Sequence, residues 1–349
     1  MSKNVFVKYG IGTDMSKDSF HGCFSGVTET GAIKIIAQKR FKNTPSGHTE
    51  FKSWIAKHRK NKELPYQILL EVTGVYHENF LYFLFDNGLA VCLELSKRVK
   101  KYLEVIGHKS KNDKLDGKGI AIMACERKLK LWQPFSKHIR KLRTLLRHRK
   151  ALIQTKNQLE NQLHAIQHSG LLEKNVVNSL KRTIKVLKKE IEKIEDQTIE
   201  LAQKEESFFE KVKLITDSVK GLGLLSVLTT VAETNGFKEF KSTKQLTSYA
   251  GYDVVETSSG KHQGKTRISK KGNTHLRTNM YMPALSIIRS KVPPFHNLYL
   301  RILARNGGIK KKALVAVQRK LLVLIYTLWK KNEAFDLKYY QNSRATIEV

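Results

Sequence analysis

One apolar series limits the fold of this chain more than any other feature: residues that alternate in steps of three and four between positions 177 and 201. Its members are Val177, Leu180, Ile184, Leu187, Ile191, Ile194, Thr198 and Leu201. Such spacing places apolar side chains on one narrow stripe of a long helix, and it is typical of a coiled coil or helical hairpin. A series with a period of seven comes before it, on the other side of Ser169 and Gly170: Leu145, Leu152, Leu159 and Ile166. The pattern predicts two long helices.

These helices can pair within one chain, as an antiparallel hairpin, or between two chains, as a homodimer. The stripe is narrow and its flanks are strongly charged, which favours the dimer; a tetramer is also open. The first helix starts with residues 137–150, which hold seven Lys or Arg and no acid. We therefore expect residues 136–206 to form a basic helix and a coiled coil, with Arg140, Arg143 and Arg147 among the nucleic-acid contacts.

Strands and helices alternate on the N-terminal side of this segment. Strand patterns with glycine-containing turns fill residues 4–38, and buried strands are expected at 67–72 and 89–95. Helical patterns cover 47–60 and 76–87, and a further helix should start near Lys114. This order predicts a mixed α/β domain over residues 1–135. Residues 207–349 read as mainly helical and form the third expected domain.

The charge balance points to a polyanionic partner. The chain has 64 Lys and Arg against 31 Asp and Glu, a formal net charge of +33. Between Thr257 and Asn332 there are 17 Lys and Arg and no acid at all. Self-repulsion of this size is costly in a compact protein, so we favour nucleic acid as the partner over an acidic membrane surface.

The cysteines and the apolar runs indicate the compartment. Cys23, Cys92 and Cys125 are far apart and lack CxxC spacing, which argues against a zinc knuckle or a disulfide framework. The N-terminus has no apolar core of a signal peptide. The longest apolar run, at 321–329, is nine residues and too short to cross a bilayer. We expect a soluble cytoplasmic protein with no membrane partner.

Four acids in the first domain are candidate metal ligands. Asp14 and Glu71 end predicted strands, and Asp113 and Asp116 lie three apart at a helix start, so they share one face. Together they could bind two divalent cations, because Mg²⁺ takes oxygen ligands and a metal pair stabilises both oxygens of a phosphoryl transfer. Taken singly, each acid is more simply a turn residue, a buried ion pair or a helix N-terminal acid.

A serine pair marks the third domain. Ser258 and Ser259 precede Gly260 in a predicted loop, and a Ser-Ser-Gly loop is usually a turn. No acid follows nearby and His262 is the nearest imidazole, so a Ser-His-Asp triad has no support. Several basic residues could grip a phosphate and neutralise its developing charge: Lys261, Lys265, Arg267, Lys270, Lys271 and Arg277. The last of these follows a helix start at Gly272 and Asn273, with Asn273 or Thr274 as the N-cap.

The order of these features resembles one family across nearly the whole chain. The segment KSKNDKLDGKGIA, with Asp113 and Asp116, looks like the paired-Asp motif of the DEDD transposases of the IS110 class of insertion sequences, relatives of Piv-type DNA invertases. The serine pair followed by RISKKGN and LR resembles the C-terminal motif of that family. The two motifs together are far more specific than either alone.

The resemblance implies a RuvC-like, RNase H-like first domain, a coiled-coil linker and a C-terminal transposase domain, in a bacterial or archaeal cytoplasm. It implies that Asp14, Glu71, Asp113 and Asp116 bind Mg²⁺, with two ions per site. It implies that Ser259 attacks DNA to form a phosphoserine link, with Ser258 as the fallback. A composite site across subunits and a bridge RNA that pairs with donor and target DNA are further properties that it implies.

This sequence departs from the family pattern at three places. KGLG stands where the family commonly has Pro-Gly-Ile-Gly, AGYDVV where Ala-Gly-Leu-x-Pro is usual, and Gly117 where Ala is frequent. None removes a proposed catalytic group, although AGYDVV could move the segment that presents Ser259. Two other functions stay open: a metal-dependent DNA junction nuclease with a structural serine, and a non-catalytic nucleic-acid-binding protein.

Overall fold

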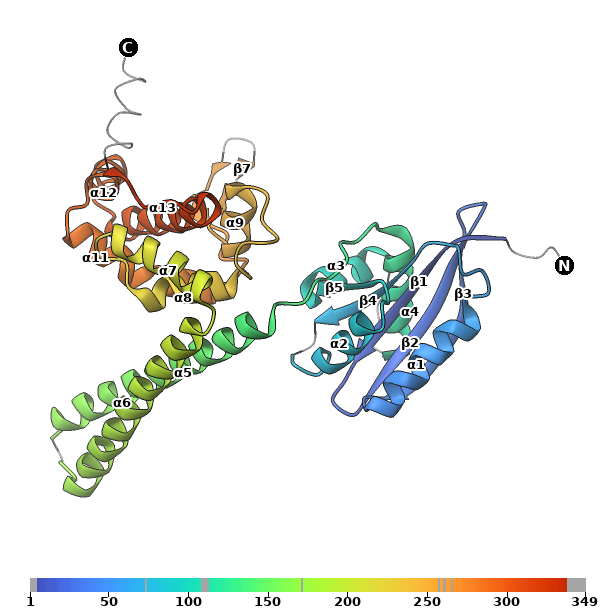
Figure 1. Ribbon diagram of the computed structural model, residues 1–349, viewed down its shortest axis with the longest axis horizontal. Coiled ribbons are helices and arrows are strands. Elements are labelled where there is room, and N and C mark those ends of the chain that lie inside the picture. The colour runs from blue at the N-terminus through green and yellow to red at the C-terminus, as the bar shows by residue number, and fades with distance from the viewer. Residues whose placement is uncertain are drawn as a thin grey trace, which may run out of the picture. The chain divides into compact units, whose positions relative to one another are not determined.

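The computed structural model describes residues 5–72, 74–107, 113–170, 172–256, 258–259, 262–264 and 266–337, with the backbone alone at 113–114, 258–259 and 262–263. The chain divides into two compact units, Met1–Pro134 and Phe135–Val349 (Figure 1). The second unit holds both the long helices and the C-terminal helices. A further domain boundary at residue 206 therefore stays a prediction.

The first unit is built on a five-stranded sheet in the order β3-β2-β1-β4-β5. The strands β1 (Phe6–Met15), β2 (Ser19–Thr28) and β3 (Ile33–Lys42) pair antiparallel. The strands β4 (Tyr66–Val72) and β5 (Val91–Leu95) continue the sheet parallel to β1. The mixed α/β character that the strand and helix patterns predicted is confirmed.

Each face of this sheet has its own core. On one face, α1 (Pro45–His58) and α2 (Glu78–Asp86) cover an aromatic cluster in which Phe20, Phe51 and Phe80 are fully buried. On the other face, α3 (Ser96–Val105) and α4 (Asp113–Glu126) pack on Leu69 and Cys92. Alternate residues of one strand therefore enter different cores.

Two glycines of β1 allow α4 to lie directly on the sheet. A Cβ on Gly10 would lie 2.7 Å from the backbone nitrogen of Cys125, and one on Gly12 would lie 2.6 Å from the carbonyl oxygen of Gly117. Real Cβ atoms do not approach backbone this closely, so only glycine fits at these two positions. As β1 advances from Gly10 to Gly12, the contact moves back along α4 towards its first turn.

The long helices form a hairpin within the chain (Figure 1). These are α5 (Lys137–Gln167) and α6 (Lys174–Gln203). Ion pairs of 2.6 Å between Arg149 and Glu195 and of 3.3 Å between Lys188 and Glu160 join them. Five residues of the predicted stripe are buried in the hairpin: Val177, Leu180, Ile184, Ile191 and Thr198. The intrachain alternative accounts for the stripe, and the dimer stays a prediction.

Helices make up most of the remaining unit: α7 (Glu206–Ser218), α8 (Leu224–Glu233), α9 (Thr243–Ala250), α10 (Thr274–Asn279), α11 (Tyr281–Arg289), α12 (Pro293–Arg305) and α13 (Lys310–Lys331). The apolar run at 321–329 lies in α13, where Leu321, Leu322 and Ile325 are fully buried. In the described part of the chain, no helix combines the length and apolar content that a membrane span requires.

A two-stranded ribbon rises between α9 and α10, where the sequence predicted a loop. In it β6 (Val254–Val255) pairs with β9 (Arg267–Ile268), and β7 (Ser258–Ser259) pairs with β8 (His262–Gln263). Its base is fixed by the backbone nitrogens of Asn273 and Ser269, which donate to the carbonyl oxygens of Tyr249 and Asp253, both at 2.7 Å.

Candidate active site and phosphate-binding residues

Two of the four predicted metal ligands occupy neighbouring strand ends. Thr13 of β1 lies opposite Leu70 of the parallel strand β4, and the next residue on each strand is Asp14 and Glu71. Asp14 faces the same side of the sheet as Gly12, because alternate residues of a strand share a face. Asp14 and Glu71 are therefore neighbours on the face that α4 covers.

The first turn of α4 reaches the same level of the sheet. A Cβ on Gly117 would lie 3.7 Å from the carbonyl oxygen of His21, and His21 is the cross-strand partner of Asp14. Asp113 and Asp116 belong to this first turn. The backbone thus brings all four acids to one end of the sheet, although the side chain of Asp113 lies outside the described residues.

The described side chains, which do not include that of Asp113, form no metal centre. Among those that the structure describes, no group of three or more His, Cys, Asp or Glu lies close enough to hold an ion. The side chains of Asp14, Glu71 and Asp116 are each engaged with another group. Carboxylate oxygens suit Mg²⁺, so the donor chemistry fits, and the four-acid site stays a prediction.

Two residues at this end of the sheet, His21 and Glu94, were not predicted from the sequence. His21 flanks Asp14 on one side, and Glu94 of β5 flanks Glu71 on the other. The Glu94 carboxylate accepts from the backbone nitrogen of Leu95 at 3.0 Å and lies 3.3 Å from Arg98. The signal was present in the parallel strand endings LLEV and CLEL, which put two glutamates in one register.

The predicted serine nucleophile lies far along the ribbon. The backbone of Ser259 pairs with His262, and Ser258 with Gln263. Gly251 pairs with Lys270 at the ribbon base, eight residues before Ser259. An extended strand rises about 3.3 Å per residue, so Ser259 can lie no further than roughly 26 Å from that base.

The predicted nucleic-acid contacts fall into three groups. Arg140, Arg143 and Arg147 lie on α5, Arg267 lies on β9, and Lys270, Lys271 and Arg277 lie at the ribbon base or on α10. Lys261 and Lys265 lie outside the described residues. The contact of Lys270 and Lys271 with a phosphate at Ser259 stays a prediction.

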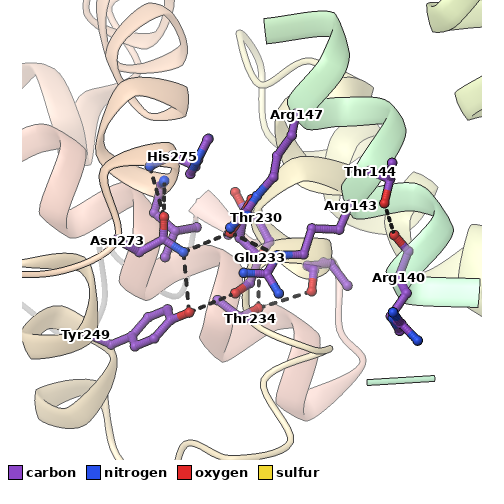
Figure 2. Close-up of polar contacts among 12 residues, drawn as sticks. Arg140, Arg143, Thr144, Arg147, Thr230, Glu233, Thr234, Tyr249, Asn273 and His275 are labelled. Carbon is purple, nitrogen blue, oxygen red and sulfur yellow. Dashed lines mark hydrogen bonds and ion pairs between the residues drawn. The ribbon is translucent and has the colours of Figure 1, made fainter. Parts of the chain in front are cut away.

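A buried carboxylate organises the second unit at the ribbon base (Figure 2). Glu233 is the last residue of α8 and its side chain is 2% exposed. The Arg147 guanidinium donates to both of its oxygens, with its Nε at 2.7 Å and its Nη2 at 2.9 Å. Asn273 donates from Nδ2 at 2.8 Å. Arg143 Nε is 3.4 Å from Oε2, a distance of attraction without a hydrogen bond.

The same residues fix the start of α10. Asn273 is its N-cap, as predicted, and its Oδ1 accepts from the backbone nitrogens of His275 at 2.9 Å and Leu276 at 3.3 Å. The hydroxyl of Tyr249 donates to the carbonyl oxygen of Glu233 at 3.3 Å. Arg277 Nη1 donates to the carbonyl oxygen of Ala250 at 2.6 Å, and so caps α9.

Charge around Glu233 shifts three pKa values. Burial raises the pKa of Glu233, but hydrogen bonds from Arg147 and Asn273, with the charge of Arg143, hold it below its ordinary value. The pKa of Lys150 is lowered by burial and by its neighbours Arg147 and Arg277, against the attraction of Glu233. The pKa of His275 is lowered by burial and by Arg147, Lys150 and Arg143, against that same carboxylate.

Comparison with known proteins decides the class. Residues 11–168 match a family model for DEDD transposases of the IS110 type, described as "Transposase". Residues 214–300 match a second model, described as "Transposase IS116/IS110/IS902 family". The chain belongs to the IS110 class of transposases. The first match of this transposase contains the four acids, and the second contains Glu233 and Ser259.

Relatives of the transposase match along almost their whole length. The pilin gene-inverting proteins of Moraxella bovis and Moraxella lacunata are each 25% identical over 332 residues, which cover 95% of this chain and 98% of theirs. The transposase for insertion sequence element IS1111A of Coxiella burnetii is 24% identical over 349 residues, covering 93% of this chain and 90% of its own. The family models and these relatives therefore support transposition and DNA recombination as the general function of this protein.

Proposed function

We propose that this IS110-class transposase cuts and rejoins DNA through a covalent link to Ser259. The hydroxyl oxygen of Ser259 attacks a DNA phosphorus, and the bond from that phosphorus to one sugar oxygen breaks. The serine proton is released, and the departing sugar oxygen takes up a proton to become a hydroxyl. Attack by the hydroxyl of another strand reverses these steps and frees the serine, so no external energy source is required.

The placement of the acids carries this proposal. Asp14 and Glu71 end adjacent parallel strands, and the first turn of α4 with Asp113 and Asp116 meets them at the same edge. In an RNase H-like fold these four would hold Mg²⁺, which supplies charge neutralisation at the reacting phosphate. The same arrangement supports a RuvC-like architecture for the first unit. Basic side chains of the second unit neutralise the remaining phosphate charge.

Selection of the donor and target DNA sequences requires a further molecule besides the protein. We infer that a bridge RNA supplies it by base pairing, and that the strongly basic surface of this chain, with a net charge of +33, binds both RNA and DNA. The metal-bearing unit of one subunit and the serine-bearing ribbon of another would complete one site in a dimer or tetramer. The pilin gene-inverting relatives, whose name describes inversion of a gene, support recombination by strand exchange.

Trapping of the covalent intermediate tests the serine mechanism. Full-length protein, Mg²⁺, RNA from the flanking region of the element and end-labelled junction DNA are incubated, denatured and separated by size. Label should migrate with the wild-type protein, and be lost with Ser259→Ala and with Asp14→Asn. Ser258→Ala and Asp18→Asn, which changes an exposed acid near the same strand end, serve as matched controls and should keep the adduct.

Each alternative function predicts a different set of labelled products in this experiment. Cleavage without an adduct, unchanged in Ser259→Ala, would mean a metal-dependent nuclease. An adduct lost only in Ser258→Ala would move the nucleophile by one residue. DNA binding with neither cleavage nor adduct, in the presence of metal and RNA, would favour a non-catalytic protein.

A further inference from the structure

The cations around Glu233 outnumber the negative charge available to them. Arg143, Arg147 and Lys150 are spaced four and three residues apart on α5, so they share one face of that helix. The charge of Glu233 also acts on His275 of α10, and Arg277 of the same helix lies near Lys150. One carboxylate therefore serves three arginine and lysine charges of α5.

Glu233 already accepts three hydrogen bonds. Both of its oxygens accept from Arg147, and Oε2 also accepts from Asn273. Glu233 lies at the carboxyl end of α8, where the helix dipole disfavours a negative charge, so these donors are needed to keep it ionised. In the described part of the chain, Lys150 has no acid within ion-pair distance.

Lys150, His275 and Arg143 make no hydrogen bond to Glu233 in the described contacts, and they lie near Arg147, which does. Lys150 is half-buried one turn beyond Arg147 on α5, and burial together with the charges of Arg147 and Arg277 lowers its pKa despite the attraction of Glu233. His275 is half-buried in the same group. Arg143 Nε is buried without a hydrogen-bond acceptor, and its guanidinium stacks 4.9 Å from the centre of the Phe135 ring.

We propose that Lys150 and His275 bind a backbone phosphate of nucleic acid at the base of the serine ribbon, with Glu233 as the positioning residue that holds α5 against α10 through Arg147 and Asn273. A phosphodiester supplies negative charge to this cluster and accepts from the Lys150 ammonium. Glu233 itself does not touch the ligand. It ties α5 to Asn273, and through Asn273 to the base of the ribbon.

This site is separate from the proposed reaction at Ser259, because its members lie at the ribbon base and Ser259 belongs to the outer strand pair of β7 and β8. It would hold a flanking phosphate of the bound strand and so fix the register of the nucleic acid relative to the serine. The inference rests on the proposed function only in taking nucleic acid as the ligand.

The salt dependence of binding tests the site. The full-length protein is titrated into a fluorescein-labelled junction DNA duplex, and separately into a fluorescein-labelled RNA hairpin from the flanking region, at several NaCl concentrations. Loss of one phosphate contact should lower the slope of log affinity against log salt by about 1. Lys150→Gln should show this loss and bind several-fold more weakly, whereas Lys150→Arg should retain the slope.

Lys189→Gln removes an equal charge from the exposed face of α6 and calibrates the general loss of electrostatic attraction. A slope for Lys150→Gln equal to that of Lys189→Gln on both probes would overturn the proposal. Loss on the DNA alone or on the RNA alone supports it and identifies the source of the phosphate. A thermal unfolding curve for each variant excludes a folding defect.

The inference and the proposed function fail separately. Ser259→Ala should leave the salt slope of wild type on both probes, because a serine hydroxyl carries no charge and releases no counterion. If no variant forms an adduct and Lys150→Gln still loses slope, the phosphate site stands and the serine mechanism does not. If adducts form and the slope of Lys150→Gln is unchanged, the serine mechanism stands and the phosphate site does not.

Discussion

Glu233 joins three segments that are far apart in the sequence. Arg147 precedes it by 86 residues and Asn273 follows it by 40. In the printed sequence it is one acid at the end of LLSVLTTVAE, and neither its burial nor its partners leave a local pattern. The acids at strand ends were identified because strand periodicity is local, whereas a buried ion pair depends on tertiary contacts that periodicity does not contain.

Replacing Glu233 by Gln should destabilise the protein at neutral pH. The change keeps the side-chain volume but removes the negative charge that Glu233 presents to Arg143 and Arg147. Because Arg147 is 39% exposed, we expect a loss of about 1–3 kcal/mol in the free energy of unfolding, below the range for a fully buried pair. Urea unfolding at pH 7 measures it, and Glu256→Gln, which changes an exposed acid of the same unit, should have little effect.

The loss should depend on pH with a defined sign. The pKa of Glu233 is lowered in the folded protein, so its contribution is complete above the pKa of the unfolded chain, about 4.3. It is lost as the pH falls through the lower, folded pKa. The difference between wild type and Glu233→Gln should therefore shrink below about pH 4.3. A difference that is constant down to pH 3 would contradict the assignment.

At the level of elements, the contact between α4 and β1 decides where the acids lie. Gly12→Ala would place a methyl group against the backbone of Gly117 and Ala121. We expect this change to push α4 off the sheet and cost about 1–3 kcal/mol. Gly117→Ala is the matched control, since its Cβ would meet nothing closer than 3.7 Å. In a helix that exchange should be neutral or stabilise by about 0.5–1 kcal/mol.

Thermal and urea unfolding of both variants give the comparison. Equal stability of Gly12→Ala and wild type would show that α4 does not lie directly on β1. In that case the convergence of Asp113 and Asp116 on Asp14 would also lose its basis.

Element prediction from the sequence succeeded where periodicity was strong and failed at the ribbon. The buried strands, the helices α1, α2, α5 and α6 and the start of α4 were predicted from apolar alternation and capping. The helix α3 at Ser96–Val105 was not predicted. The ribbon strands have only two residues each. TSSGKHQGK has no apolar alternation, so it reads as a loop. The two sides of the ribbon are brought together by contacts at its base, where the backbone nitrogen of Asn273 donates to the carbonyl oxygen of Tyr249. These residues are 24 apart in the sequence, so no local pattern predicts their contact.

For the whole molecule, the net charge of +33 makes stability sensitive to salt. Like charges repel over a screening length that falls from about 30 Å at 0.01 M salt to about 8 Å at 0.15 M. The midpoint of thermal unfolding should therefore rise over this range. Each 1 kcal/mol gained corresponds to roughly 2–4 °C for a unit of this size. NaCl and KCl should act equally, and a midpoint that falls with salt would mean that attractive ion pairs dominate.

The hairpin of α5 and α6 has a consequence for how two chains can associate. Five members of the α6 stripe are already buried within one chain, so a second chain could pack on those five only by domain swapping, with α6 of each chain packed on α5 of the other. Everything after α6 would be exchanged with it. Each serine ribbon would then stand on the α5 arginines of the partner. Such a dimer would form and dissociate slowly, because each hairpin must first open.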